Sequence, residues 1–291
     1  MSLLLIGTFG SGNFASAENQ KNKRGDITTQ EYQNLLNLGF TDEEIEFMDQ
    51  EELEQNKNLK GKVVGQDINY VKTTHGTETK VEKLDEKTYK EEVNKVKEKE
   101  KKTSDISAQL SKSTTTSYKT MTTSVVLLSG STYRVKNSVT WDRMPMYSYV
   151  DVTGVGINEA YWGPLPGTEY GKQNWKTWSY CNGYLNGSAT YTKDSTKWKR
   201  GSGGYSLKIN LPDDETTGGC AADRVEELSS YMYYSVSPMT STNRLDAYGQ
   251  YAHQESNYTL TPSISLSGVE FSVSPSKEFS FHPNTHVLYW R

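Results

Sequence analysis

The feature that most constrains the fold of this chain is a series of short β-type segments separated by turns rich in glycine, asparagine and aspartate. Residues 147–154 alternate between the two faces of a pleated strand, and similar segments recur as far as residue 290. Many short strands with little helix predict a mainly β fold, with an antiparallel β-sandwich or jelly-roll-like domain over residues 113–291. The other candidate strands span residues 125–128, 133–141, 189–193, 205–211, 231–236, 258–266, 269–273 and 287–290.

Composition supports strands over helices. Hydrophobic residues make up only 34% of the chain, and 20 Tyr and 6 Trp carry much of the apolar surface. Tyr, Trp and Thr suit half-buried pleated surfaces, and aromatic rings must supply much of the core. The net charge of −4 lacks the basic excess of a nucleic-acid-binding protein, so we expect no nucleic acid partner.

The first 17 residues have the pattern of a secretory signal peptide. An apolar stretch runs from Leu3 to Phe9, and the small residues Ala15 and Ala17 suit cleavage before Glu18. No Lys or Arg precedes the stretch, so in this interpretation the true start of the chain lies upstream of Met1. The alternative is a disordered or strand-like N-terminus. The stretch is too short to span a bilayer, so we expect a secreted or cell-surface protein without a transmembrane segment in the mature chain.

Two short helices are predicted over residues 27–60, after a polar and disordered segment at residues 18–26. Thr28 with Glu31 and Thr41 with Glu44 form two capping boxes, and Gly39 supplies a left-handed stop between them. Helices this short need a partner surface. They either pack against another part of the molecule or form a small docking module.

Residues 61–112 are strongly charged. Between residues 78 and 102 the chain holds nine Lys and eight Asp or Glu, with a thin apolar stripe at roughly helical spacing. We expect a flexible charged linker or a solvated helix, with a coiled-coil contact as the alternative.

Three segments, residues 31–40, 132–141 and 144–156, together resemble a group of uncharacterised secreted proteins of Gram-positive bacteria. The resemblance covers about half of the chain. It implies an exported protein of similar layout, and it brings no activity or functional residues with it.

The two cysteines, Cys181 and Cys220, lie 39 positions apart in the β-rich part. In an exported chain an even number of cysteines predicts a disulfide. Closing a loop of this size stabilises a fold by about 3–4 kcal/mol on the chain-entropy model. Two buried free thiols are the alternative.

No metal or cofactor site is expected. His282 and His286 are four apart, but Pro283 makes a helix there improbable, and we expect all four histidines to lie on the surface or in loops. The densest acidic spot of the β-rich part offers hard oxygen ligands for calcium, but it lacks the spacing of an EF-hand loop. It consists of Asp213, Asp214 and Glu215.

Catalysis by a pair of carboxylates is the enzymatic alternative, and it would make this chain a carbohydrate-directed hydrolase. The sequence gives no reason to prefer one candidate glutamate over another, and it contains no Gly-x-Ser-x-Gly motif of a serine hydrolase. They are Glu159, Glu169, Glu226, Glu255 and Glu270.

The segment between residues 161 and 184 is the densest in aromatic rings, and glycine, proline, asparagine and lysine are interleaved with them. These rings belong either to the core or to a binding surface that stacks on sugars or anchors a protein. Trp175 and Trp178 are three apart, so on a strand they face opposite sides. The rings are Tyr161, Trp162, Tyr170, Trp175, Trp178, Tyr180 and Tyr184.

The leading functional hypothesis is a non-catalytic extracellular interaction protein that binds an unknown protein or glycan through this aromatic segment. The hydrolase is the second hypothesis. A β-pore-forming toxin is the third, because the Ser/Thr-rich stretch Ser113–Ser124 is of a type that refolds into an amphipathic hairpin, although too few of its positions are apolar.

Overall fold

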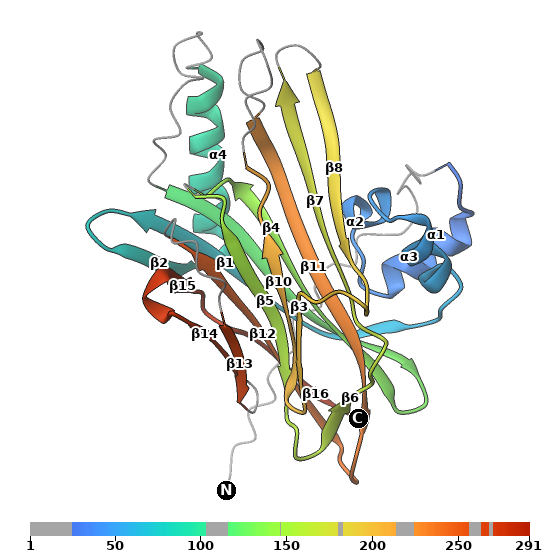
Figure 1. Cartoon of the computed structure of the whole chain (residues 1–291). Coiled ribbons are helices and arrows are strands. Elements are labelled where there is room, and N and C mark those ends of the chain that lie inside the picture. The colour runs from blue at the N-terminus through green and yellow to red at the C-terminus, as the bar shows by residue number, and fades with distance from the viewer. Residues whose placement is uncertain are drawn as a thin grey trace, which may run out of the picture.

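The computed structural model describes residues 25–102, 116–145, 147–179, 183–213, 224–255, 263–267 and 270–291. The fold is mainly β, as predicted: two antiparallel sheets pack face to face as a β-sandwich, and the helices lie outside them (Figure 1). Among the described residues no helix is both long and apolar enough to cross a bilayer.

The larger sheet has the strand order β2-β1-β3-β4-β11-β7-β8, and β6 pairs with β11. Its longest strand, β11, is central and pairs with β4 on one side and with β7 on the other. The strands are β1 (Lys62–His75), β2 (Thr79–Leu84), β3 (Thr116–Ser129), β4 (Thr132–Arg143), β6 (Trp162–Pro164), β7 (Tyr170–Ser179), β8 (Gly183–Tyr191) and β11 (Arg224–Pro238).

The smaller sheet has the order β15-β12-β5-β10-β9, and β16 pairs with β12. A separate ribbon of two strands, β13 (Ser263–Ser267) and β14 (Glu270–Ser274), contributes Phe271 and Val273 to a small apolar cluster with this sheet. A 3-10 turn, η2 (Ser276–Glu278), follows the ribbon. The sheet's strands are β5 (Val150–Ile157), β9 (Trp198–Gly201), β10 (Gly204–Asn210), β12 (Arg244–Gln254), β15 (Phe279–Phe281) and β16 (Thr285–Trp290).

The main core lies between the two sheets and draws on both. Val135 and Met232 come from the larger sheet, Val155 and Leu207 from the smaller one, and all four are buried. Aromatic rings fill much of the remaining volume, as the composition predicts. The hydroxyl of the buried Tyr234 donates a hydrogen bond of 2.7 Å to the carbonyl of Val155, which satisfies the polar end of a core side chain.

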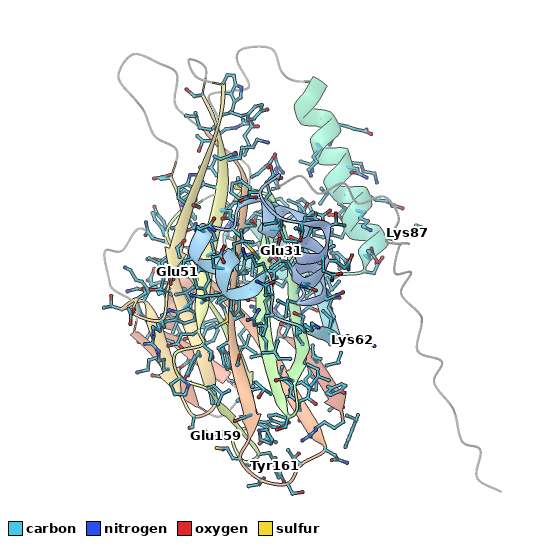
Figure 2. All side chains as sticks on the ribbon, turned by 90° about the vertical axis from the view of Figure 1, so that its right-hand side faces the viewer. Glu31, Glu51, Lys62, Lys87, Glu159 and Tyr161 are labelled. Atoms are coloured by element: carbon cyan, nitrogen blue, oxygen red, sulfur yellow. The ribbon has the colours of Figure 1, made fainter. Side chains whose placement is uncertain are left out.

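Three short helices cover part of the outer face of the larger sheet: α1 (Thr29–Asn37), α2 (Asp42–Glu46) and α3 (Gln50–Asn56) (Figures 1 and 2). Both predicted capping boxes are present, and Gly39 has a φ of 79° between the first two helices. The second predicted helix is divided, because the side chain of Asp49 accepts a hydrogen bond from the Glu52 amide and starts α3. Residues from these helices share an apolar cluster with Val126 and Tyr231 of the sheet.

The expectation of a linker or solvated helix over residues 61–112 is wrong for residues 62–84. These residues form β1 and β2, and β1 pairs along its length with β3 in the larger sheet. Val71 is fully buried in the main core. Charge density predicts a solvated segment, whereas β1 pairs with β2 in a local hairpin and with β3, whose paired residues lie more than 40 positions away.

Helix α4 (Glu86–Lys102) carries the thin apolar stripe of the charged segment. Tyr89 and Val93 are buried against Tyr118 of β3, so one face of the helix is attached to the larger sheet. The predicted signal peptide at residues 1–17 and residues 18–24 of the polar segment lie outside the described residues, as do Cys181 and Cys220.

Candidate functional site

The candidate site is the free end of the hairpin formed by β7 and β8. The two strands pair without a register shift from Gly171 with Tyr191 to Ser179 with Gly183. Figure 1 shows the end of β7 and the start of β8 rising past helices α1, α2 and α3. Most of β8 is exposed on the edge of the larger sheet.

The inner face of the hairpin carries Trp175, which packs against the main core and is partly buried. Its cross-strand partner is Gly187. A Cβ atom at position 187 would lie 2.3 Å from the indole, so a glycine there makes room for the ring. Trp175 is therefore a supporting residue of the hairpin.

The outer face of the hairpin end carries an aromatic pair. Trp178 lies directly opposite Tyr184, and the Tyr184 side chain is 60% exposed. The Lys176 ammonium lies 5.0 Å from the centre of the Tyr184 ring and 3.4 Å from a carboxylate oxygen of Glu227. On the opposite face Leu185 is 44% exposed. The free end thus exposes apolar surface on both faces, with charged groups beside it.

The other predicted aromatic residues do not join this site. Tyr161 is exposed and lies near Glu159, at the end of the sandwich away from the hairpin tip (Figure 2). Trp162 is fully buried, and its indole N–H donates to the Arg244 carbonyl at 2.7 Å. Tyr170 is buried beneath the helices, and Tyr180 lies outside the described residues.

A network of charged groups lies between the helices and the larger sheet, and sequence analysis did not find it. Asp49 accepts hydrogen bonds from Tyr170, Lys172 and Thr190, at 2.7, 3.0 and 2.8 Å. The sheet side chain Lys136 pairs with Glu44 of α2. These contacts join the helical segment to three strands of the sheet, so they position it on the outer face.

Glu52 is the most deeply buried carboxylate of this network. Tyr231 donates a hydrogen bond of 2.7 Å to it. Burial raises the pKa of Glu52 to about 7, although the bond from Tyr231 opposes the shift. Because the group is enclosed by the helices, it serves attachment of the helical segment and does not form an accessible acid.

A second buried cluster links the two sheets, and its His253, a buried residue of β12, corrects the expectation that all histidines lie on the surface or in loops. His253 pairs with Asp151 at 2.6 Å, and His282 lies 2.9 Å from the ammonium of Lys119. Each of these four residues is at most 4% exposed. Burial lowers the pKa of Lys119 to about 7. Because these side chains are buried between the sheets, the cluster contributes to holding the two sheets together.

The five candidate glutamates do not assemble into a pair of carboxylates. Glu159 bonds to Ser202, Glu169 pairs with Arg200, and Glu226 pairs with Arg224. Glu255 lies 3.2 Å from the imidazole of His75. Glu270 lines a small pocket of about 180 Å³, which also includes Tyr251 and Phe281. Each glutamate has its own surroundings, and the hydrolase is not favoured.

Metal ligation has no support in the part of the chain that the structure describes, since no group of three or more His, Cys, Asp or Glu gathers there. Asp213 is described and exposed, whereas Asp214 and Glu215 of the acidic spot lie outside the described residues. The Ser/Thr-rich stretch is described from Thr116 onward, where it forms the first part of β3 between β1 and β4.

Comparison with known proteins adds little. No family model matches the chain, and no curated protein sequence matches it. A solved structure titled BspA_C_mut is similar at a TM-score of 0.25 and 7% identity over 58% of this chain and 54% of that one, so the match spans about half of that structure. A structure titled "Pore forming protein" has a TM-score of 0.22 at 6% identity over 58% of this chain and 84% of that one.

The delta-toxin of Clostridium perfringens has a TM-score of 0.21 at 8% identity, over 59% of this chain and 82% of the toxin. At TM-scores this low, none of the three likenesses carries an argument about what this chain does.

Proposed function

We propose that this chain is a secreted, non-catalytic interaction protein, and that the free end of the β7–β8 hairpin binds an extracellular partner. The observation that carries the proposal is the exposed Tyr184 beside Trp178, with Leu185 exposed on the opposite face. Export is supported by the apolar stretch and small residues of the first 17 positions.

The composition of this surface favours a binding role. Tyr and Trp are enriched among the residues that dominate binding energy, because they bury a large area with little loss of side-chain freedom. Lys176 and Glu227 flank the aromatic pair and supply charges at its rim. Rim charges of this kind guide the approach and orientation of a partner.

A protein partner fits this surface better than a glycan. A sugar ring stacks on the flat face of an aromatic ring, and the Lys176 ammonium already lies over the ring of Tyr184. Leu185 adds aliphatic area on the other face, which a protein interface buries and a sugar does not stack on.

The test compares Y184A/L185A with Y161A in binding to arrays of extracellular proteins and of glycans. Tyr161 is the matched control because it is an exposed tyrosine, 45% accessible, away from the hairpin tip. We expect Y184A/L185A to lose binding by about 10-fold or more, since hot-spot truncations cost about 2 kcal/mol. Y161A should bind as the unmodified chain does.

Both variants should keep their thermal stability within about 0.5 kcal/mol, because exposed side chains are removed. Equal binding by Y184A/L185A and the unmodified chain would show that the hairpin end is not the contact surface. If binding were observed only on the glycan array, the partner would be a glycan and not a protein.

A further inference from the structure

The two edge strands of the larger sheet are protected to different degrees. β2 is a six-residue edge that contains Lys80, Glu82 and Lys83. β8 is a nine-residue edge, from Gly183 to Tyr191, with no charged residue and no proline. The part of the chain that the structure describes places no strand against the free side of β8.

An edge of this kind is a template for another strand. Edge strands present unpaired backbone N–H and C=O groups, and monomeric proteins usually guard them with charges, proline, bulges or short length. β2 is short and charged, whereas β8 has none of these four features, and its pairing with β7 is free of bulges. The start of α3 contacts β8 near its C-terminal end, where Thr190 donates a hydrogen bond to Asp49. The unguarded edge therefore indicates a surface made for strand pairing.

We propose that β8 is a dimerisation edge, at which two copies of this chain pair their β8 strands antiparallel about a twofold axis at Gly187. The inference concerns association of the chain with itself and does not rest on the binding function proposed above. Its centre, Asn186 to Ser188, lies outside the surface proposed there, while Tyr184 and Leu185 belong to both surfaces. The paired edges join the larger sheets of two copies into one continuous sheet.

This register keeps the outer faces of the two β8 strands on one side of the joined sheet and their inner faces on the other. It sets Asn186 opposite Ser188 of the second copy on the outer face, and Tyr184 opposite Thr190. On the inner face it sets Leu185 opposite Ala189, so an exposed aliphatic side chain gains an apolar neighbour. A slip by one residue would place each polar side chain of one copy on the face where the other copy carries its apolar ones.

The choice of a second copy over another partner follows from symmetry. An isologous interface needs a surface that is complementary to itself, and a strand without charge pairs with its own copy without repulsion. In both copies the Trp175 indole packs over Gly187. The residue at the proposed twofold axis therefore has no side chain and the same surroundings in each copy.

The experiment is sedimentation velocity of the full chain and of two double variants, N186K/S188K and N186E/S188E. Asn186 and Ser188 are both exposed, and the proposed register brings each against the other position of the second copy. Like charges then face each other twice, so each variant alone should dimerise at least about 10-fold more weakly than the unmodified chain. Mixed in equal amounts, the two variants should form a heterodimer, because every facing pair is then Lys with Glu.

The matched control is T77K/S272K, which adds the same two positive charges at exposed positions away from β8 and should dimerise normally. Circular dichroism and melting curves verify that each variant is folded. A monomeric unmodified chain would overturn the proposal, and so would dimers of N186K/S188K as tight as those of the unmodified chain. A mixture that stays monomeric would overturn the antiparallel register centred on Gly187.

Discussion

Neighbouring aromatic residues of β7 have different roles because a strand alternates its faces. Trp175 packs into the core, and Trp178 lies on the outer face against Tyr184, as their spacing of three predicts. The spacing does not determine whether Trp175 or Trp178 faces inward. That was decided by the position of the smaller sheet and by the glycine opposite Trp175.

The first prediction at this scale concerns these two residues. W175A should lower the free energy of unfolding by about 3 kcal/mol, because it leaves a cavity at the core and an empty space over Gly187. W178A should lower it by less than about 1 kcal/mol. Urea unfolding of both variants measures the difference, and equal losses would contradict the assignment of faces.

The second prediction at the residue scale concerns Glu52, whose pKa is about 7 in the folded chain and about 4.3 in an unfolded one. The folded state binds the extra proton between these values. The contribution of this group to stability is therefore fully present below about pH 4 and is lost as the pH rises through about 7.

E52Q cannot ionise and still accepts the hydrogen bond from Tyr231, so its stability relative to the unmodified chain should be greater at pH 8 than at pH 5. Urea unfolding at both pH values measures this. E51Q is the matched control, since Glu51 lies one residue away on α3 and is exposed. If the free energies of unfolding of E52Q and of the unmodified chain changed with pH in parallel, the raised pKa of the buried Glu52 would be refuted.

At the scale of elements, the helical segment is attached to the sheet by polar contacts as well as by its apolar face. Asp49 is at once the N-cap of α3 and the acceptor for side chains of β7 and β8. This dual role ties the start of one helix to the hairpin that carries the candidate site. The capping boxes at Thr28 and Thr41 were predictable from sequence because they are local. The Asp49 cap was not predicted, and its partners in β7 and β8 are more than 100 residues away.

The β7–β8 hairpin itself was only partly predictable. The sequence pattern predicts its second strand over residues 189–193, whereas the Asn186-Gly187 pair is typical of a turn. The structure places both residues inside β8, where Gly187 faces Trp175. From sequence alone, a glycine inside a strand cannot be distinguished from a glycine in a turn. The distinction requires the neighbouring strand's side chain that packs over the glycine.

At the scale of the whole molecule, β1 makes the charged segment part of the sandwich. It adds Val71 to the core, and the Asn69 side chain donates a hydrogen bond of 2.8 Å to the Pro283 carbonyl, so it also contacts the C-terminal part. The β-rich domain expected at residues 113–291 is thus incomplete without residues 62–75.

The prediction at this scale is that a chain truncated to residues 116–291 does not unfold cooperatively. Removing β1 leaves β3 with an unpaired backbone edge and opens the core at Val71. A chain of residues 25–291 should unfold in one transition. Calorimetry of both measures this, and a single sharp transition in the shorter chain would show that β1 is dispensable.

The sequence alone determined the mainly β class, the two capping boxes, the glycine stop between the first helices and the opposite faces of Trp175 and Trp178. Each of these depends on residues within a few positions of one another, where spacing and backbone preference act directly. The tertiary structure decided that β1 belongs to the sheet, that His253 and His282 are buried, and that Tyr161, Trp162 and Tyr170 lie apart from the hairpin end. Those outcomes depend on pairing between distant strands, because burial of a side chain is a property of the surface that packs over it.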